Sequence, residues 1–320
     1  MRRSDVVHLG LMLAALGVAY LIPFELLLLA YAVLGPAHYL TEISWLHDRK
    51  YYLPHRGFGL ALALTALGAM FLASPYWYGV VVWGALVACA TLAMEGARAR
   101  IVVGGAGLAL TALLAALQAP FTVLAVLLPT LIHVSLFTLV FMLLGAFRSR
   151  SPAQFALVGA YLAAVALILA APPTVGWVFP PLASQAEPSF GDIPGALGRV
   201  LGLPDLTLDA RLMGLLSFVY AYHYLNWFIK AEVIHWNRIP RGRAIAIAAL
   251  SAAATVFYFV DFALGFTVLL LISLMHVLLE FPLNSRSIRE LAGVAVRRPP
   301  TPAPALAKAA PARRRRAARR

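Results

Sequence analysis

The chain has 320 residues, of which 62% are apolar and only 12% charged, and its mean hydropathy is +0.84. A soluble domain usually carries about a quarter charged residues, so this composition excludes water as the main solvent of the protein. The net charge of +13 would be typical of a nucleic-acid-binding protein. Much of that charge falls after Asn284, however, and the chain before it is nearly neutral. We therefore expect no nucleic-acid partner.

Apolar runs recur along the whole chain, and each is long enough to cross a hydrocarbon layer of roughly 30 Å as a helix. They do not alternate with polar residues, as the strands of a transmembrane β-barrel would. The expected fold class is all-α, a polytopic membrane helix bundle of about ten transmembrane helices. The expected spans are 6–21, 24–46, 58–73, 76–94, 101–118, 121–146, 153–171, 210–230, 244–262 and 265–282.

The placement of Lys and Arg predicts the orientation of these spans, because short loops rich in basic residues stay in the cytoplasm. With about ten spans, the basic loops around Arg49, Arg98, Arg148 and Arg238 all fall on one side. The loops at 22–23, 74–75 and 119–120 on the other side carry no basic residue. We expect a multi-pass protein of the cell inner membrane with both termini in the cytoplasm.

Two regions follow from this pattern. Residues 1–284 form the expected transmembrane domain, which includes a long extracytoplasmic loop at 172–209. Residues 285–320 are rich in Pro, Ala and Arg, a composition that cannot bury a hydrophobic core. We expect them to form a disordered, basic cytoplasmic tail that binds anionic lipid headgroups.

Ionisable residues inside spans mark candidate sites, because each costs about 2.5–3.5 kcal/mol or more at mid-depth. Four histidines stand in the second, sixth, eighth and tenth expected spans: His38, His133, His223 and His276. These helices would all run in the same direction, and a rise of about 1.5 Å per residue places the four imidazoles within roughly 10 Å of depth. Neutral imidazoles suit iron and zinc. We predict one metal site with these four ligands and prefer iron(II) to zinc or heme.

Polar partners follow the histidines at helical spacing, which places them on the same face. Glu42 and Glu280 each come four residues after a histidine, Asn226 comes three after His223, and Thr138 is a weaker candidate beside His133. Metal-bound histidines usually need such partners to orient the ring. Nearby aromatic residues predict a binding surface for a flat, apolar substrate: Tyr39, Tyr222, Tyr224 and Trp227.

The segments 35–42 (GPAHYLTE), 131–133 (LIH), 222–228 (YHYLNWF) and 274–281 (LMHVLLEF) carry these residues. In order and character they resemble the His-centred motifs of the bacteriorhodopsin-related-protein-like β-carotene dioxygenases. In this resemblance His38 with Glu42 and His276 with Glu280 match motifs in which an acidic residue follows the histidine, and Trp227 stands where the family has a further His. It implies a membrane enzyme whose histidine-bound iron(II) cleaves β-carotene to retinal.

The function expected from these residues is therefore a membrane-embedded non-heme iron oxygenase that cleaves or oxidises a carotenoid or similar apolar lipid. No catalytic group beyond the metal ligands is expected. Two alternatives stay open. Pairs of the histidines would suit the axial positions of hemes in an electron-transfer protein, and a transporter would use them to line a proton or metal path.

Overall fold

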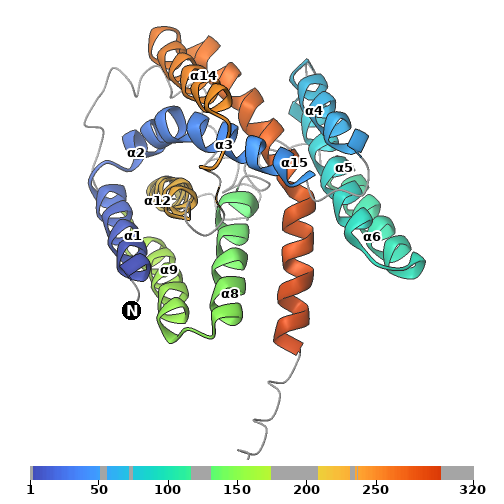
Figure 1. The fold of residues 1–320 in the computed structure, drawn as a ribbon, viewed down its shortest axis with the longest axis horizontal. Helices are drawn as coiled ribbons and strands as arrows, with labels where there is room; N and C mark the ends of the chain where they lie inside the picture. The colour runs from blue at the N-terminus through green and yellow to red at the C-terminus, as the bar shows by residue number, and fades with distance from the viewer. Residues whose placement is uncertain are drawn as a thin grey trace, which may run out of the picture.

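A computed structural model of the chain describes residues 3–50, 56–71, 75–116, 131–173, 208–230, 235 and 237–296. All regular elements within these ranges are helices, which confirms the expected all-α class (Figure 1). The predicted loop 172–209 lies almost wholly outside the described residues, as do residues 121–130 of the sixth predicted span.

Helix α12 (Leu208–Ile229) lies at the centre of the bundle and is seen end-on in Figure 1. It contacts α1 (Arg3–Leu21), α2 (Pro23–Leu29), η1 (Ala30–Leu34) and α9 (Pro152–Ala170). It also reaches α3 (Gly35–Asp48) and η4 (Ile132–Phe137). Because other helices surround α12, its polar residues Ser217, His223 and Asn226 face protein and not lipid.

The longest element, α15 (Phe262–Val296), joins this bundle to a second group of helices. It packs against α3, α8 (Thr138–Ser149) and α14 (Arg241–Val260) on one side, and α4 (Arg56–Met70) and α5 (Pro75–Ala93) on the other. Helix α6 (Ala97–Ala116) packs along α5. Figure 1 shows α4, α5 and α6 to the side of the main bundle.

Each predicted span coincides with a helix over at least part of its length. In the described part of the chain, six helices are long and apolar enough to cross a membrane: Arg3–Leu21, Pro23–Asp48, Ile132–Ser149, Pro152–Ala170, Arg241–Val260 and Phe262–Val294. Large apolar side chains such as Ile101, Ile245 and Val260 point outward and are 70–78% exposed. A lipid solvent accounts for them, since water does not favour such a surface. The fold is therefore that of a membrane protein, and the count of about ten crossings stays a prediction.

Two helices contain π-helical turns, which hold one more residue per hydrogen-bonded ring than an α-helix. In the continuous helix 23–48, the π turn η1 lies directly before Gly35-Pro36. Pro36 lacks an N–H and its ring crowds the preceding turn, so the wider turn accommodates it. The second π turn, η4, contains His133. Such turns occur often at functional sites.

The α14–α15 connection differs slightly from the prediction. The expected ninth and tenth spans leave residues 263–264 between them, but α15 already begins at Phe262, and the carboxylate of Asp261 accepts a hydrogen bond from Leu264 N at 3.0 Å. Gly265 instead provides a close approach between the two helices, because a Cβ there would lie 2.2 Å from the Tyr258 Cα. The turn is therefore made by a capping aspartate.

The boundary predicted at residue 284 needs correction. Helix α15 continues without a break to Val296, and Asn284 and Ser287 on it are buried at 0% and 4% exposure. The prediction of a disordered tail is thus wrong for residues 285–296, because one face of this segment packs against the bundle and stabilises the helix. Residues 297–320 lie outside the described part, and the role of the tail at lipid headgroups stays a prediction.

Candidate metal centre

The four predicted histidines converge in the interior of the bundle. His38 comes from α3, His133 from η4, His223 from α12 and His276 from α15, and their exposure is only 1–7%. One ring nitrogen from each lies within 4.8 Å of the others. Around the cluster, neighbouring ring centroids are 4.6–5.0 Å apart, in the order His38, His223, His133, His276 and back to His38.

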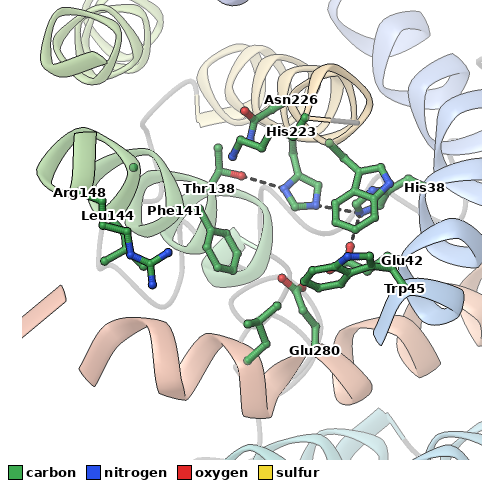
Figure 2. Close-up of a pocket in the computed structure, with 14 residues that line it drawn as sticks. His38, Glu42, Trp45, Thr138, Phe141, Leu144, Arg148, His223, Asn226 and Glu280 are labelled. Carbon is green, nitrogen blue, oxygen red and sulfur yellow. Dashed lines mark hydrogen bonds and ion pairs between the residues drawn. The ribbon is translucent and has the colours of Figure 1, made fainter. Parts of the chain in front are cut away.

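Two of the rings are oriented from outside the cluster. His276 Nδ1 lies 3.0 Å from the backbone carbonyl of Ser273, so Nδ1 must carry the proton and donate it. Its Nε2 is then left with a free lone pair. His223 Nδ1 lies 2.8 Å from the Thr138 hydroxyl, and its Nε2 lies 3.1 Å from His38 Nε2 inside the cluster (Figure 2). Metal-binding histidines are held in this way, with one nitrogen bonded outward and the other directed into the cluster.

Thr138 was expected beside His133, and the structure pairs it with His223 instead. His133 and Thr138 are five residues apart, which places them on different faces of a regular α-helix. The π turn η4 lies between them and widens the helix so that both face inward. His133 thus reaches the cluster, while Thr138 bonds His223 on the neighbouring helix α12.

Several buried polar atoms at this site have no hydrogen-bond partner. They include His38 Nδ1, both ring nitrogens of His133, His276 Nε2 and Glu280 Oε2. Buried polar groups in proteins are nearly always paired, because an unpaired one costs about 1–3 kcal/mol. Several unpaired ring nitrogens gathered in one buried cluster offer lone pairs suited to binding a metal ion.

The two predicted carboxylates lie next to the imidazoles. Glu42 Oε2 is 3.3 Å from His38 Nε2 and 3.7 Å from His276 Nε2. Glu280 Oε2 lies 3.0 Å from His133 Nδ1, although its position in the sequence suggested His276 as its partner. With His276, both carboxylates form a second group of potential metal ligands whose atoms lie within 4.8 Å of one another. We call the four histidines and the two glutamates the histidine–glutamate centre.

A pocket of about 230 Å³ opens beside this centre. His38, Glu42, His223 and Glu280 line its inner end, and the close-up shows Glu280 projecting from α15 toward them (Figure 2). Asn226 also faces the pocket and has a buried amide oxygen without a partner, but forms no hydrogen bond with His223. The other walls are mainly apolar and include Trp45, Phe141, Leu144, Trp227 and Leu283, with Arg148 and Lys230 adding positive charge.

Of the four residues expected to bind a substrate, Trp227 lines this pocket and the three tyrosines do not. Tyr39 stacks on His276 with a ring-centroid distance of 4.6 Å, and its hydroxyl bonds that of Tyr224 at 2.5 Å. Tyr222 packs against Phe218 and Tyr161, away from the imidazoles. The Tyr39–Tyr224 pair joins two histidine-bearing helices, α3 and α12, while Tyr222 joins α12 to α9.

Sequence reasoning missed some residues of the pocket. Trp45 lies three residues after Glu42, and Phe141 three after Thr138, so helical spacing already places them on the same faces. Lys230 and Arg148 stand at helix ends, where basic residues are common and carry little signal. The Ser273 carbonyl is a backbone group, and no sequence pattern would have indicated its role.

The histidine–glutamate centre cannot be assigned by similarity to a known protein. Comparison finds no matching family model, no similar curated protein and no similar solved structure.

Proposed function

We propose that this protein is a membrane-embedded, non-heme iron oxygenase that cleaves or oxidises a carotenoid or a similar apolar lipid. The observation that carries this proposal is the convergence of four buried imidazoles, from four different helices, with ligand atoms within 4.8 Å of one another. The resemblance of the His-centred segments to β-carotene dioxygenases supplies the reaction class. Assignment of the metal as iron(II) is part of the proposal.

The residues present fit a metal ion. Ligand bonds of about 2.0–2.2 Å allow opposite donor atoms to be at most about 4.4 Å apart, so small side-chain rotations would bring all four nitrogens to one ion. A bound ion would pair the free nitrogens of His133 and His276. It would also offset the cost of burying ionisable groups at this depth.

Each residue of the site then has a physical role. His38, His133, His223 and His276 would bind the ion, while the Thr138 hydroxyl orients the His223 ring and the Ser273 carbonyl fixes the tautomer of His276. The walls formed by Trp45, Phe141 and Leu283 would hold an apolar chain against the centre and exclude water. Bound iron(II) supplies the activation of oxygen.

The arrangement of the rings argues against the heme alternative. A heme with two axial histidines needs a flat slot between imidazoles that face each other across the macrocycle. Here each ring makes edge contacts with its neighbours, with centroids at most 5.0 Å apart. No macrocycle fits between them without separation of the helices.

Purified full-length protein tests this proposal. We expect stoichiometric iron, no Soret absorption band, and oxygen-dependent conversion of β-carotene or another polyene lipid to aldehyde products. A Soret band would replace the proposal by the electron-transfer alternative. Metal transport into vesicles, without oxygen uptake, would replace it by the transporter alternative.

The topology is a second part of the proposal: about ten crossings in the inner membrane with both termini in the cytoplasm. Because Cys89 is buried, single cysteines can report on accessibility with little background. Ser149→Cys and Ala171→Cys, at opposite ends of α9, should be labelled from opposite sides of sealed vesicles. Only Ser149→Cys should react from the cytoplasmic side, and labelling of both from one side would exclude this topology.

A further inference from the structure

We infer that the centre holds two metal ions, and that Glu42, His276 and Glu280 bind the second one. This inference rests on the proposed metal centre, changes the role of its carboxylates and assigns His276 to the second ion in place of the first. The sequence suggests that Glu42 and Glu280 orient histidines from behind. The structure places them on the side where a metal would bind.

The nitrogen that each carboxylate faces decides between these roles. An orienting carboxylate contacts the nitrogen on the far side of the ring from the metal. For His276 that far nitrogen is Nδ1, which already donates to Ser273. Glu42 Oε2 instead approaches His276 Nε2 at 3.7 Å and His38 Nε2 at 3.3 Å. His38 Nε2 is also the nitrogen that faces His223, so Glu42 lies inside the cluster.

Glu280 supports the same conclusion. Its Oε2 lies 3.0 Å from His133 Nδ1 but forms no hydrogen bond, and both atoms are buried. In the described part of the chain, neither Glu42 nor Glu280 forms an ion pair with a Lys or Arg. Lys230 lines the same pocket and adds positive charge there, but it makes no ion pair with either group. Two neighbouring buried carboxylates are costly, and a metal ion bound between them would reduce their repulsion.

Counting the ligands favours two ions over one. Four imidazoles and two carboxylates on a single ion would fill about six coordination positions and leave none for oxygen or substrate. His276 has one free nitrogen and can therefore serve one ion only. If His276 binds the same ion as the carboxylates, that ion has the ligands Glu42, His276 and Glu280. The other ion then has the ligands His38, His133 and His223. Both ions then retain open positions, as catalytic metals require.

Metal stoichiometry of the full-length protein tests this inference. The protein is loaded anaerobically with iron(II) alone and desalted, and iron is counted per chain by mass spectrometry. We expect about two ions in the wild type and about one in Glu42→Gln and Glu280→Gln. Glu25→Gln is the matched control, because Glu25 is as deeply buried as Glu42 but lies in α2, outside the centre. It should keep both ions.

X-ray absorption of the loaded wild type gives a measurement that does not depend on any variant. Ions that share a carboxylate-bridged site should show a metal–metal distance of about 3.5–4 Å. One ion per chain in the wild type, with no such distance, would overturn the second site and leave the proposed histidine site intact. No bound iron at all would overturn the proposed function itself.

Discussion

The polar groups of this protein occur in two contrasting regions. At the helix ends, Arg243 bonds Asp48 at 2.7 Å, Arg289 bonds Glu95 at 3.1 Å and Arg148 pairs with Glu290. These pairs, which we call the rim ion pairs, are 34–86% exposed and each charge has a partner of opposite sign. In the histidine–glutamate centre the groups are buried, and several have no hydrogen-bond partner.

This contrast indicates where function lies. Exposed ion pairs form easily in water and contribute little to stability. Buried, unpaired nitrogens and carboxylates are expensive in a membrane, so a stable chain retains them only if something else pairs with them. The rim ion pairs are thus explained by their exposure at the helix ends, whereas the buried centre is explained by the metal binding that we propose.

The largest effect should come from removing a histidine of the centre. His223→Ala and His133→Ala should each remove the ion bound by the histidines and leave at most the ion assigned to Glu42, His276 and Glu280, because each loss removes a ligand that no neighbour replaces. Iron content of purified protein measures this. His8→Ala is the control, because His8 lies in α1 and belongs to neither group of converging ligands. Full iron content in His223→Ala would show that the histidine–glutamate centre does not bind the metal.

A smaller loss is expected from the outer support of His223. Thr138→Val keeps the shape of the side chain but removes the hydroxyl bonded to His223 Nδ1. Loss of such a partner typically weakens metal binding by about 10–100-fold, which competition with a chelator would measure. Thr267→Val removes a hydroxyl that bonds only the backbone of its own helix. Equal affinities in the two variants would show that Thr138 does not orient the ring.

The Tyr39–Tyr224 pair tests whether the surroundings of the centre are purely structural. Tyr39→Phe leaves the buried Tyr224 hydroxyl without its partner, which should cost about 1–3 kcal/mol of unfolding free energy. Unfolding by SDS in mixed micelles measures it. The double variant Tyr39→Phe, Tyr224→Phe removes both hydroxyls and should recover part of the loss. Additive losses would mean that the two hydroxyls do not interact.

The smallest effect should be at the rim. Arg243→Gln removes an ion pair that is about one-third exposed on the arginine side. Solvent screening limits its worth to about 0.2–1 kcal/mol, and the difference should shrink as salt is added. The same SDS unfolding measures it, and iron content should not change. If Arg243→Gln lost more unfolding free energy than Tyr39→Phe, the rim ion pairs would contribute substantially to stability, which contradicts the comparison between the two regions.

Spacing along the chain was a good guide to which side chains share a helix face and a poor guide to their closest partners. The histidines come together as their similar depths predicted, and Glu42 lies against His38 at the expected four-residue spacing. Glu280 was assigned to His276 on the same spacing and lies closer to His133. Same-face arguments identify which side chains share a helix surface, but not which neighbouring helix supplies the closest partner.

The sequence alone indicated that this protein lies in lipid, and it identified the histidines that are unusual there. Long apolar runs are readable because backbone groups in lipid must be paired within a helix, and intramembrane histidines are conspicuous because they are costly. Only the tertiary structure decided which nitrogen of His276 and His223 faces inward, that Glu42 lies among the imidazoles, and that Thr138 bonds His223. The reason is that ring orientation depends on hydrogen bonds between helices and on a local π turn, and neither leaves a periodic signal in the chain.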